Sequence, residues 1–173
     1  DEGCGWRPDA WAGELTAEFR ALQLRDLTIA QVQVPLRFKP GQIVSDPGVK
    51  LLIDAEASQY IELTANLDFA EQRLDAAVSG KLDPVQLWQQ LKLPENALLQ
   101  RVQLHGPPLS FTGKLTDSSF DWHEWNGEMA LSAEHVSYEN LDFNQVQTQV
   151  DIARGKLVFR ELTGKSKSFE HFD

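Results

Sequence analysis

The chain has 173 residues, of which 42% are hydrophobic and 24% charged, so it is long enough to bury the core of one domain. Its formal net charge is −10 at pH 7, and the 16 Lys and Arg residues are scattered. This charge argues against nucleic acid as a partner and against docking onto anionic lipid headgroups, because both need clustered cations. Cys4 is the single cysteine, so an internal disulfide is excluded. Cysteine content therefore does not indicate whether the protein works in an oxidising or a reducing compartment.

The two ends of the sequence look cut. Residues 1–7 do not resemble a signal peptide and do not begin with an initiator methionine. The sequence contains no run of about 18 apolar residues of the kind that spans a membrane. We therefore expect a piece of a longer protein, in which any targeting segment lies elsewhere. Within it we predict an N-terminal loop or short helix over 1–16, an antiparallel β domain over 17–164 and a disordered or truncated tail over 165–173. The opening helix would fall within residues 6–19.

Alternation of apolar and polar residues is the dominant pattern along the chain, and it is typical of strands with one dry face. The first clear run contains Pro35, which indicates an edge strand or a bulge because proline cannot donate to the ladder. The segment 70–73 separates two runs and is predicted to be a hairpin turn. The apolar positions of the predicted strands are Val32, Val34, Leu36, Phe38; Val49, Leu51, Ile53, Ala55; Ile61, Leu63, Ala65, Leu67, Phe69; Leu74, Ala76, Val78; Val102, Leu104; Leu109, Phe111; Trp125, Met129, Leu131; Val146, Val150, Ile152; and Leu157, Phe159.

Turn residues lie between several of these runs. Pro40-Gly41 and Pro47-Gly48 both suit a type II turn, which requires a positive φ at its third residue. Arg154-Gly155 lies between two alternating runs and is predicted to form a tight hairpin turn.

One short helix is predicted near residues 84–91. Asp83 can cap the amides of its first turn, Pro84 suits the first helical position, and Val85, Trp88 and Leu91 fall on one face. About two turns of helix are not stable alone, so we expect this helix to pack on a sheet. Together these patterns predict a mainly β fold, an antiparallel, curled sheet that is either an open groove or sandwich-like, with one or two short helices.

No pattern in the sequence indicates catalysis. Glycines are dispersed without a phosphate-binding loop, and no serine has a nucleophile-elbow context. The segment Asp121-Trp122-His123-Glu124-Trp125 holds metal-ligand types, but in a strand Glu124 would face away from Asp121 and His123. We therefore interpret it as a polar strand face between two packed tryptophans, and we expect no enzyme activity, no metal and no cofactor.

Two stretches of sequence resemble each other. Residues 27–44 and 141–159 each contain an apolar strand, a Gln-Val-Gln phrase, further alternation, a glycine turn and a second strand. This indicates either a duplication or two hairpins under the same constraint.

Phrases in the second half resemble the repeating C-terminal part of AsmA-like proteins. They are Phe111-Thr-Gly-Lys-Leu115, the run from Trp125 to Val146, and Val150-Asp-Ile-Ala-Arg-Gly-Lys-Leu-Val-Phe-Arg-Glu-Leu162. The resemblance covers residues 109–164 well and 17–91 loosely, although the family's N-terminal membrane helix is missing. It implies a long β-groove in the bacterial envelope or periplasm, anchored in the inner membrane and associated with lipid movement and outer-membrane assembly.

On that resemblance, the expected partner is a lipid or another apolar ligand, together with the rest of a longer parent chain. Membrane contact would be made only through segments that this chain lacks. The predicted groove residues are Val32, Val34, Leu36, Phe38, Ile61, Leu63, Leu67, Phe69, Met129 and Leu131. Two other functions fit the same pattern: a closed β-sandwich that binds carbohydrate through Trp122 and Trp125, or a purely structural domain.

Overall fold

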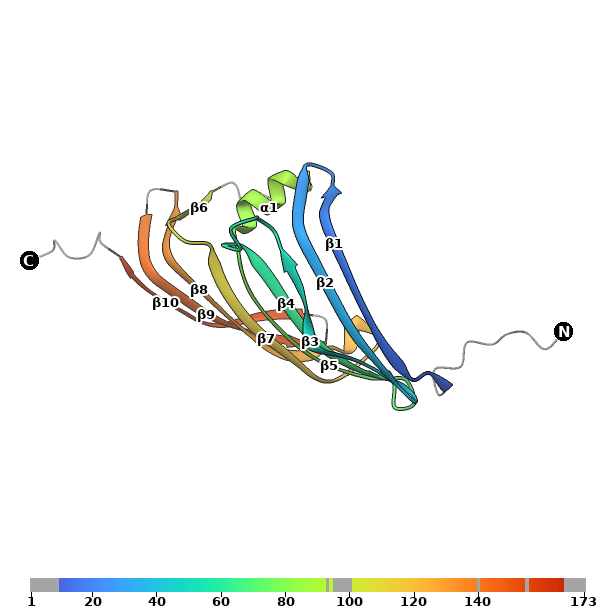
Figure 1. Ribbon diagram of the computed structural model, residues 1–173. Coiled ribbons are helices and arrows are strands. Elements are labelled where there is room, and N and C mark those ends of the chain that lie inside the picture. Colours follow the sequence, from blue (N-terminus) through green and yellow to red (C-terminus); the bar gives the residue numbers. More distant parts are fainter. Residues whose placement is uncertain (1–9, 93, 95–100, 140, 155, 167–173) are drawn as a thin grey trace, which may run out of the picture.

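A computed structural model describes residues 10–92, 94, 101–139, 141–154 and 156–166. It contains ten strands and one α-helix (Figure 1). The strands are β1 (Gly13–Leu24), β2 (Leu27–Lys39), β3 (Gln42–Leu52), β4 (Tyr60–Asp68), β5 (Arg73–Leu82), β6 (Val102–His105), β7 (Leu109–Ser119), β8 (Asn126–Tyr138), β9 (Leu141–Ala153) and β10 (Lys156–Ser166). The helix α1 covers Pro84–Gln90, and a 3₁₀ turn, η2, covers Trp122–Glu124.

All the strands belong to one antiparallel sheet in the order β1-β2-β3-β4-β5-β7-β8-β9-β10, while the short β6 pairs with the upper part of β8. The predicted mainly β, antiparallel fold is confirmed, and the sheet is open, not closed. Figure 1 shows the sheet bending so that β1–β2 and β8–β10 rise on opposite sides, with α1 at the upper end between them. Consecutive strands pair with each other except around β6, so most connections are hairpins.

The register gives the sheet one apolar face and one polar face. Leu63, Val78, Gly113, Met129 and Val150 are successive cross-strand partners from β4 to β9. The adjacent row starts at Thr64 and continues through Ala77, Lys114, Glu128 and Asp151. Because directly opposed residues of an antiparallel sheet point the same way, each row belongs to one face.

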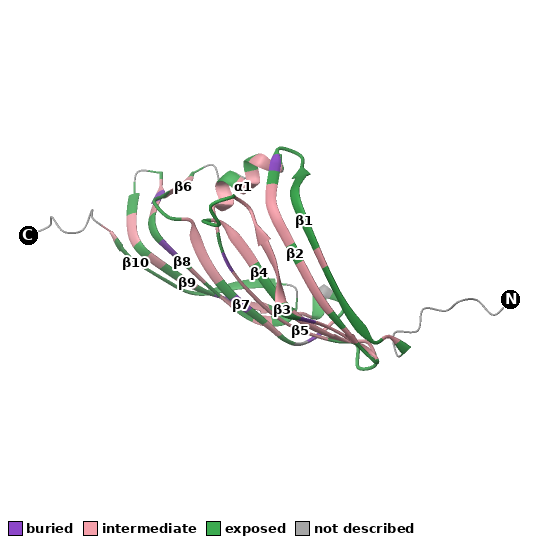
Figure 2. Ribbon diagram, viewed as in Figure 1, coloured by how far each residue is buried: buried purple, intermediate pink, exposed green. Residues whose placement is uncertain are grey.

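In the described part of the chain, no second layer of sheet covers the apolar face. Among the described residues, only Leu27, Ala133 and Val150 are apolar and buried, and Figure 2 shows half-buried and exposed residues along almost every strand. A domain of ordinary construction buries most of its apolar face against another element. Here the apolar side chains contact mainly their neighbours on the same face, which leaves their outer surfaces accessible.

Helix α1 covers one end of this face. The Asp83 carboxylate accepts from the amides of Val85 and Gln86, both at 3.0 Å, and Pro84 occupies the first helical position, as predicted. The amide of Asp26 donates to the carbonyl of Gln90 at 3.2 Å. The next residue, Leu27, is one of the three buried apolar residues. The helix therefore closes the upper end of the sheet beside β2.

Two breaks in the ladder keep the apolar side chains on one face. Pairing skips Ala21 and Ala30 between β1 and β2, and it skips Gln145 and Glu134 between β8 and β9. Ala21 and Gln145 have positive φ angles of 52° and 53°. The register is the same on both sides of each gap, while the apolar residues that flank it are three residues apart, so the alternation changes phase at the unpaired position.

This change of phase explains an apolar step of three residues. Ile29 and Val32 on β2, and Phe143 and Val146 on β9, are each three residues apart, and all four are half-buried. The two stretches that resemble each other in sequence, 27–44 and 141–159, each contain one unpaired position, Ala30 and Gln145, as well as a hairpin turn.

The structure confirms two predicted turns and corrects a third. Gly41, with φ 75°, joins β2 to β3, and Arg154, with φ 51°, lies between β9 and β10. Pro47-Gly48 does not end a strand but lies inside β3, where the pairing advances four residues, from Ser45 to Val49, against two on β4. A Cβ on Gly48 would lie 2.9 Å from the carbonyl oxygen of Leu63, so the bulge brings the two backbones together.

Of the two alternatives predicted from Pro35, the structure has the bulge. The residue lies in the irregular stretch of the β2–β3 register between Gln33 and Arg37, and β2 is not an edge strand, because it lies between β1 and β3. One other strand prediction needs correction. The run from Val49 to Ala55 stops early, since β3 ends at Leu52 and residues 53 and 54 bend away.

The helix expected within residues 6–19 is wrong from Gly13 onward, where the chain is a strand; of the described residues before it, only Ala10 belongs to a 3₁₀ turn. Strand β1 begins at Gly13, and the period-two pattern of Leu15, Ala17 and Phe19 is the signal that the helix prediction overlooked. The β region therefore starts before residue 17, and β10 continues to Ser166, within the expected tail.

Candidate apolar binding face

The ten predicted groove residues lie on one face of the sheet. Val32, Val34, Leu36 and Phe38 come from β2, Met129 and Leu131 from β8, and Ile61, Leu63, Leu67 and Phe69 from β4 and the residue after it. One cross-strand row joins the three groups: Val32, Leu51, Ile61, Gly80, Phe111 and Leu131. We call the surface that these residues define the apolar face.

None of the ten residues is fully buried. Nine are half-buried, and Leu63 retains 37% of its surface accessible. In a sealed core such residues would be almost completely covered. Their burial pattern fits a packed but one-sided apolar surface.

Sequence reasoning missed part of this face at both edges. On β1 the exposed apolar residues include Leu15 and Phe19, at 48% and 47%. On β10 they are Leu157, Phe159 and Leu162, at 63%, 66% and 76%, and all three are paired with apolar-face positions on β9. Alternation could have identified the residues on β1. It did identify Leu157 and Phe159 as strand positions, whereas Leu162 follows a register shift.

Phe111 fits over a glycine at the centre of the face. A Cβ on Gly80 would lie 2.2 Å from the carbonyl oxygen of Tyr60 and 2.7 Å from Cζ of Phe111. Gly80 is buried, and its cross-strand partners are Ile61 and Phe111. The missing side chain therefore lets the phenyl ring lie close to the sheet.

The lower end of the sheet is bounded by aromatic residues and η2. Phe69 and Phe120 meet edge to face with their ring centroids 5.7 Å apart. The fully buried Ser118 donates through Oγ to the carbonyl of Asn126 at 3.2 Å. These contacts hold the start of β8 against the end of β7 without covering the apolar face between them.

The acidic and histidine-containing segment at this end is not a strand, contrary to the sequence prediction. Residues 122–124 form η2, in which the Asp121 carboxylate accepts from the amide of His123 at 3.0 Å and lies 2.8 Å from its ring Nδ1. The amide hydrogen bond and the ring of His123 hold the pKa of Asp121 below its usual value. Trp125 is half-buried and donates through Nε1 to the carbonyl of Ser119 at 3.2 Å. The segment thus forms a hydrogen-bonded turn.

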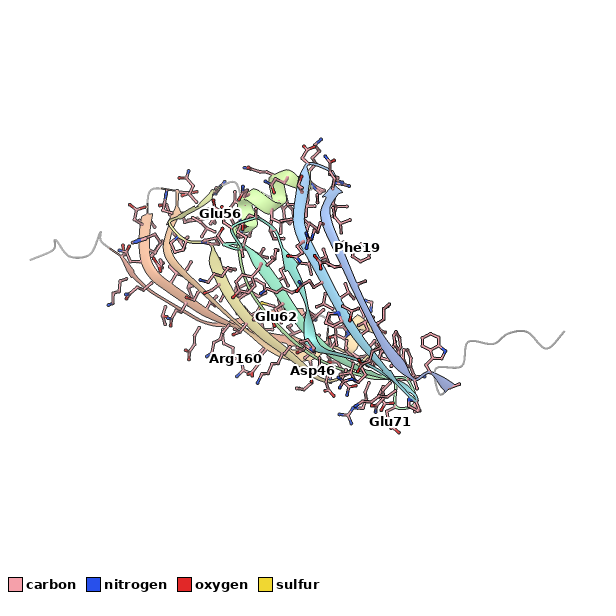
Figure 3. All side chains as sticks on the ribbon, in the orientation of Figure 1. Phe19, Asp46, Glu56, Glu62, Glu71 and Arg160 are labelled. Atoms are coloured by element: carbon pink, nitrogen blue, oxygen red, sulfur yellow. The ribbon has the colours of Figure 1, made fainter. Side chains whose placement is uncertain are left out.

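A shallow hollow of about 480 Å³ lies over the polar face, lined in part by Glu62, Lys114, Glu128, Asp151 and Arg160. Arg160, labelled in Figure 3, forms an ion pair with Asp151 across the β9–β10 hairpin. None of these acidic residues is buried. The hollow therefore offers no desolvated carboxylate of the kind that acid–base catalysis uses.

Comparison with models of protein families, with curated proteins and with solved structures found no match. Within the described ranges, no three His, Cys, Asp or Glu side chains gather closely enough to hold a metal ion. Nor does the described part of the chain contain a helix with the length and apolarity needed to cross a membrane.

Proposed function

We propose that this chain is a non-enzymatic segment of an AsmA-like envelope protein, whose apolar face binds lipid acyl chains or similar apolar ligands. The observation that carries the proposal is the combination of a continuous apolar face with very little burial. Only three apolar residues are buried in the described structure, while half-buried apolar side chains follow one another from β2 to β9. An apolar surface of that extent marks a site for a partner or ligand.

The hydrophobic effect is large enough to hold such a ligand without any specific chemical group. Each methylene removed from water contributes about 0.8 kcal/mol, so a chain of about 16 carbons gains on the order of 10 kcal/mol before ordering costs. The polar headgroup would stay in water at the rim of the sheet. Transfer along the face would then be passive, with neither nucleophile nor cofactor.

The cellular setting follows from the family resemblance. We propose a periplasmic location in the cell envelope, within a longer parent chain anchored in the inner membrane, and a role in lipid transfer that supports outer-membrane assembly. The long period-two phrases in residues 109–164 that carry the resemblance correspond to β7–β10 and their hairpins.

Co-purification of lipid tests the proposal. The chain is purified from bacteria and extracted with organic solvent, and the extract is analysed by mass spectrometry. The control is a soluble protein that binds no lipid and is purified in the same way. We expect phospholipid in amounts that scale with the protein. An extract without lipid above the control would contradict the proposal.

Two variants on β4 test which face of the sheet binds the lipid. Leu67→Arg places a charge on the apolar face, whereas Thr64→Arg places the same charge on the polar face, at a position that is already exposed. We expect Leu67→Arg to lose most of the bound lipid and Thr64→Arg to retain it, with folding checked by circular dichroism. Equal retention in two folded variants would remove β4 from the binding face.

A further inference from the structure

Within the described residues, strand β1 is a long edge of the sheet. Among the described strands it pairs only with β2, and its residues 13–20 contain neither a proline nor a register shift. Natural edge strands usually carry a bulge, a proline or charged side chains, because bare backbone groups invite pairing with another chain. The charges on β1 are of both signs. The other edge, β10, has two register irregularities. The two edges are therefore not equivalent.

The sequence of β1 is self-complementary when it is laid antiparallel to itself about Ala17. In that register Leu15 lies opposite the partner's Phe19, and Glu14 lies opposite the partner's Arg20. We propose that two copies of this chain associate through antiparallel pairing of their β1 strands, with the twofold axis at Ala17. Each apolar residue then meets an apolar one, and each of the two outer charges meets its opposite.

The charged side chains that this pairing needs are largely exposed to solvent. The side chains of Arg20 and Glu14 are 77% and 72% exposed. Their present contacts lie within the same chain: Arg20 with Glu18 at 2.6 Å, and Glu14 with Arg37 at 3.1 Å. Because Arg37 lies on β2 behind Glu14, it can continue to contact that carboxylate after the partner's Arg20 arrives. Opposite charges directly across an antiparallel pair are stabilising.

The same geometry disfavours pairing through β10. That strand carries Lys156, Arg160 and Lys165 against a single acid, Glu161. Two copies placed side by side would bring these cations together. Its irregular register also prevents a continuous ladder.

A twofold axis perpendicular to the sheet keeps the apolar faces of both copies on the same side. Leu15 and Phe19, about half exposed in the single chain, would become interior residues of a joined apolar face. Such an isologous contact closes after two copies and does not form fibres. The inference does not depend on whether the apolar face takes lipid.

Charge reversal in solution tests the pairing. Sedimentation velocity over a concentration series should show a monomer–dimer equilibrium for the unaltered chain. Arg20→Glu and Glu14→Arg should each weaken the dimer at least tenfold. An equimolar mixture of the two variants should dimerise again, because each supplies the charge that the other requires. Lys156→Glu, on the opposite edge, should leave the equilibrium unchanged.

Cross-linking tests the register. Directly opposed residues have Cα atoms about 4.5–5.5 Å apart, within the range that a disulfide bridges. In a Cys4→Ser background, Ala17→Cys should therefore form a covalent dimer on mild oxidation, and Leu157→Cys should not. A chain that stays monomeric at every concentration, a mixture that fails to dimerise, or equal cross-linking at the two positions would overturn the proposal.

Discussion

Val150 and Phe159 are direct cross-strand partners on the apolar face, yet Val150 is 3% exposed and Phe159 66%. Val150 lies on the inner strand β9, and Phe159 lies on the adjacent edge strand β10, so the exposed fraction rises sharply from one strand to the next. The comparison shows that burial in this molecule comes from neighbours on the same face, since no second layer covers it. An apolar residue with a strand on each side is partly covered by its neighbours, whereas one on an edge strand keeps a larger part of its surface exposed.

A glycine substitution gives the largest expected contrast between centre and edge. Gly80→Ala, at the centre, places a Cβ 2.2 Å from a backbone oxygen, and we expect a loss of about 2–3 kcal/mol in the free energy of unfolding. Gly164→Ala, on β10, meets nothing closer than 3.4 Å and should cost little or slightly stabilise the fold. Urea denaturation compares the two; similar midpoints would contradict the assignment of a tight centre.

Truncation of the two cross-strand partners gives a contrast of about 2 kcal/mol. Val150→Ala removes buried methyl groups and should destabilise the protein by about 2 kcal/mol. Phe159→Ala removes a larger but exposed side chain and should change stability by less than about 0.5 kcal/mol in lipid-free protein. If Phe159→Ala proves the more destabilising change in thermal or urea unfolding, the open-edge description is wrong.

The cap of α1 tests how much the covered upper end contributes. Asp83→Ala leaves two amides without their acceptor and should cost about 1 kcal/mol. Gln89→Ala, an exposed position on the same helix, is the matched control and should be close to neutral. Equal effects in urea titrations would mean that the helix end does not depend on this cap.

The smallest expected effect concerns pH and the turn between β4 and β5. Asp68 accepts from the amides of Glu71 and Ala70, and from Gln42, and these bonds lower its pKa, with the Glu71 amide as the main cause. A lowered pKa in the folded state stabilises the protein above the unfolded pKa of about 3.9, and this contribution is lost as the pH falls through the folded value. Asp68→Asn should therefore flatten the decline in stability between about pH 5 and pH 2. If the variant lost stability with falling pH as steeply as the unaltered chain, other carboxyl groups would be responsible for the loss.

Most of the sheet could be predicted because its signals are local. The runs ending in Phe38, Phe69 and Val78 alternate so regularly that the strands and the faces of their side chains follow from the sequence. The helix at Pro84–Gln90 was predictable for the same reason, since its cap and first residue are adjacent in sequence.

The remaining features depend on contacts between segments. Pro47-Gly48 has the composition of a turn, but its neighbours on β2 and β4 hold it inside a strand as a bulge. The positive φ angles at Ala21 and Gln145 have no sequence signature, because the residues that adopt them are not glycine. Likewise, alternation indicates which residues share a face, but it does not indicate whether another layer covers that face.

The central claim is that the apolar face remains accessible to a ligand, and photo-crosslinking with a diazirine-bearing fatty acid tests it most directly. Peptide mapping should place the adducts on apolar-face residues such as Leu63, Met129 and Phe159. Adducts confined to polar-face positions such as Thr64, Lys114 and Glu128, or no adducts above those on an unrelated soluble protein, would contradict the account.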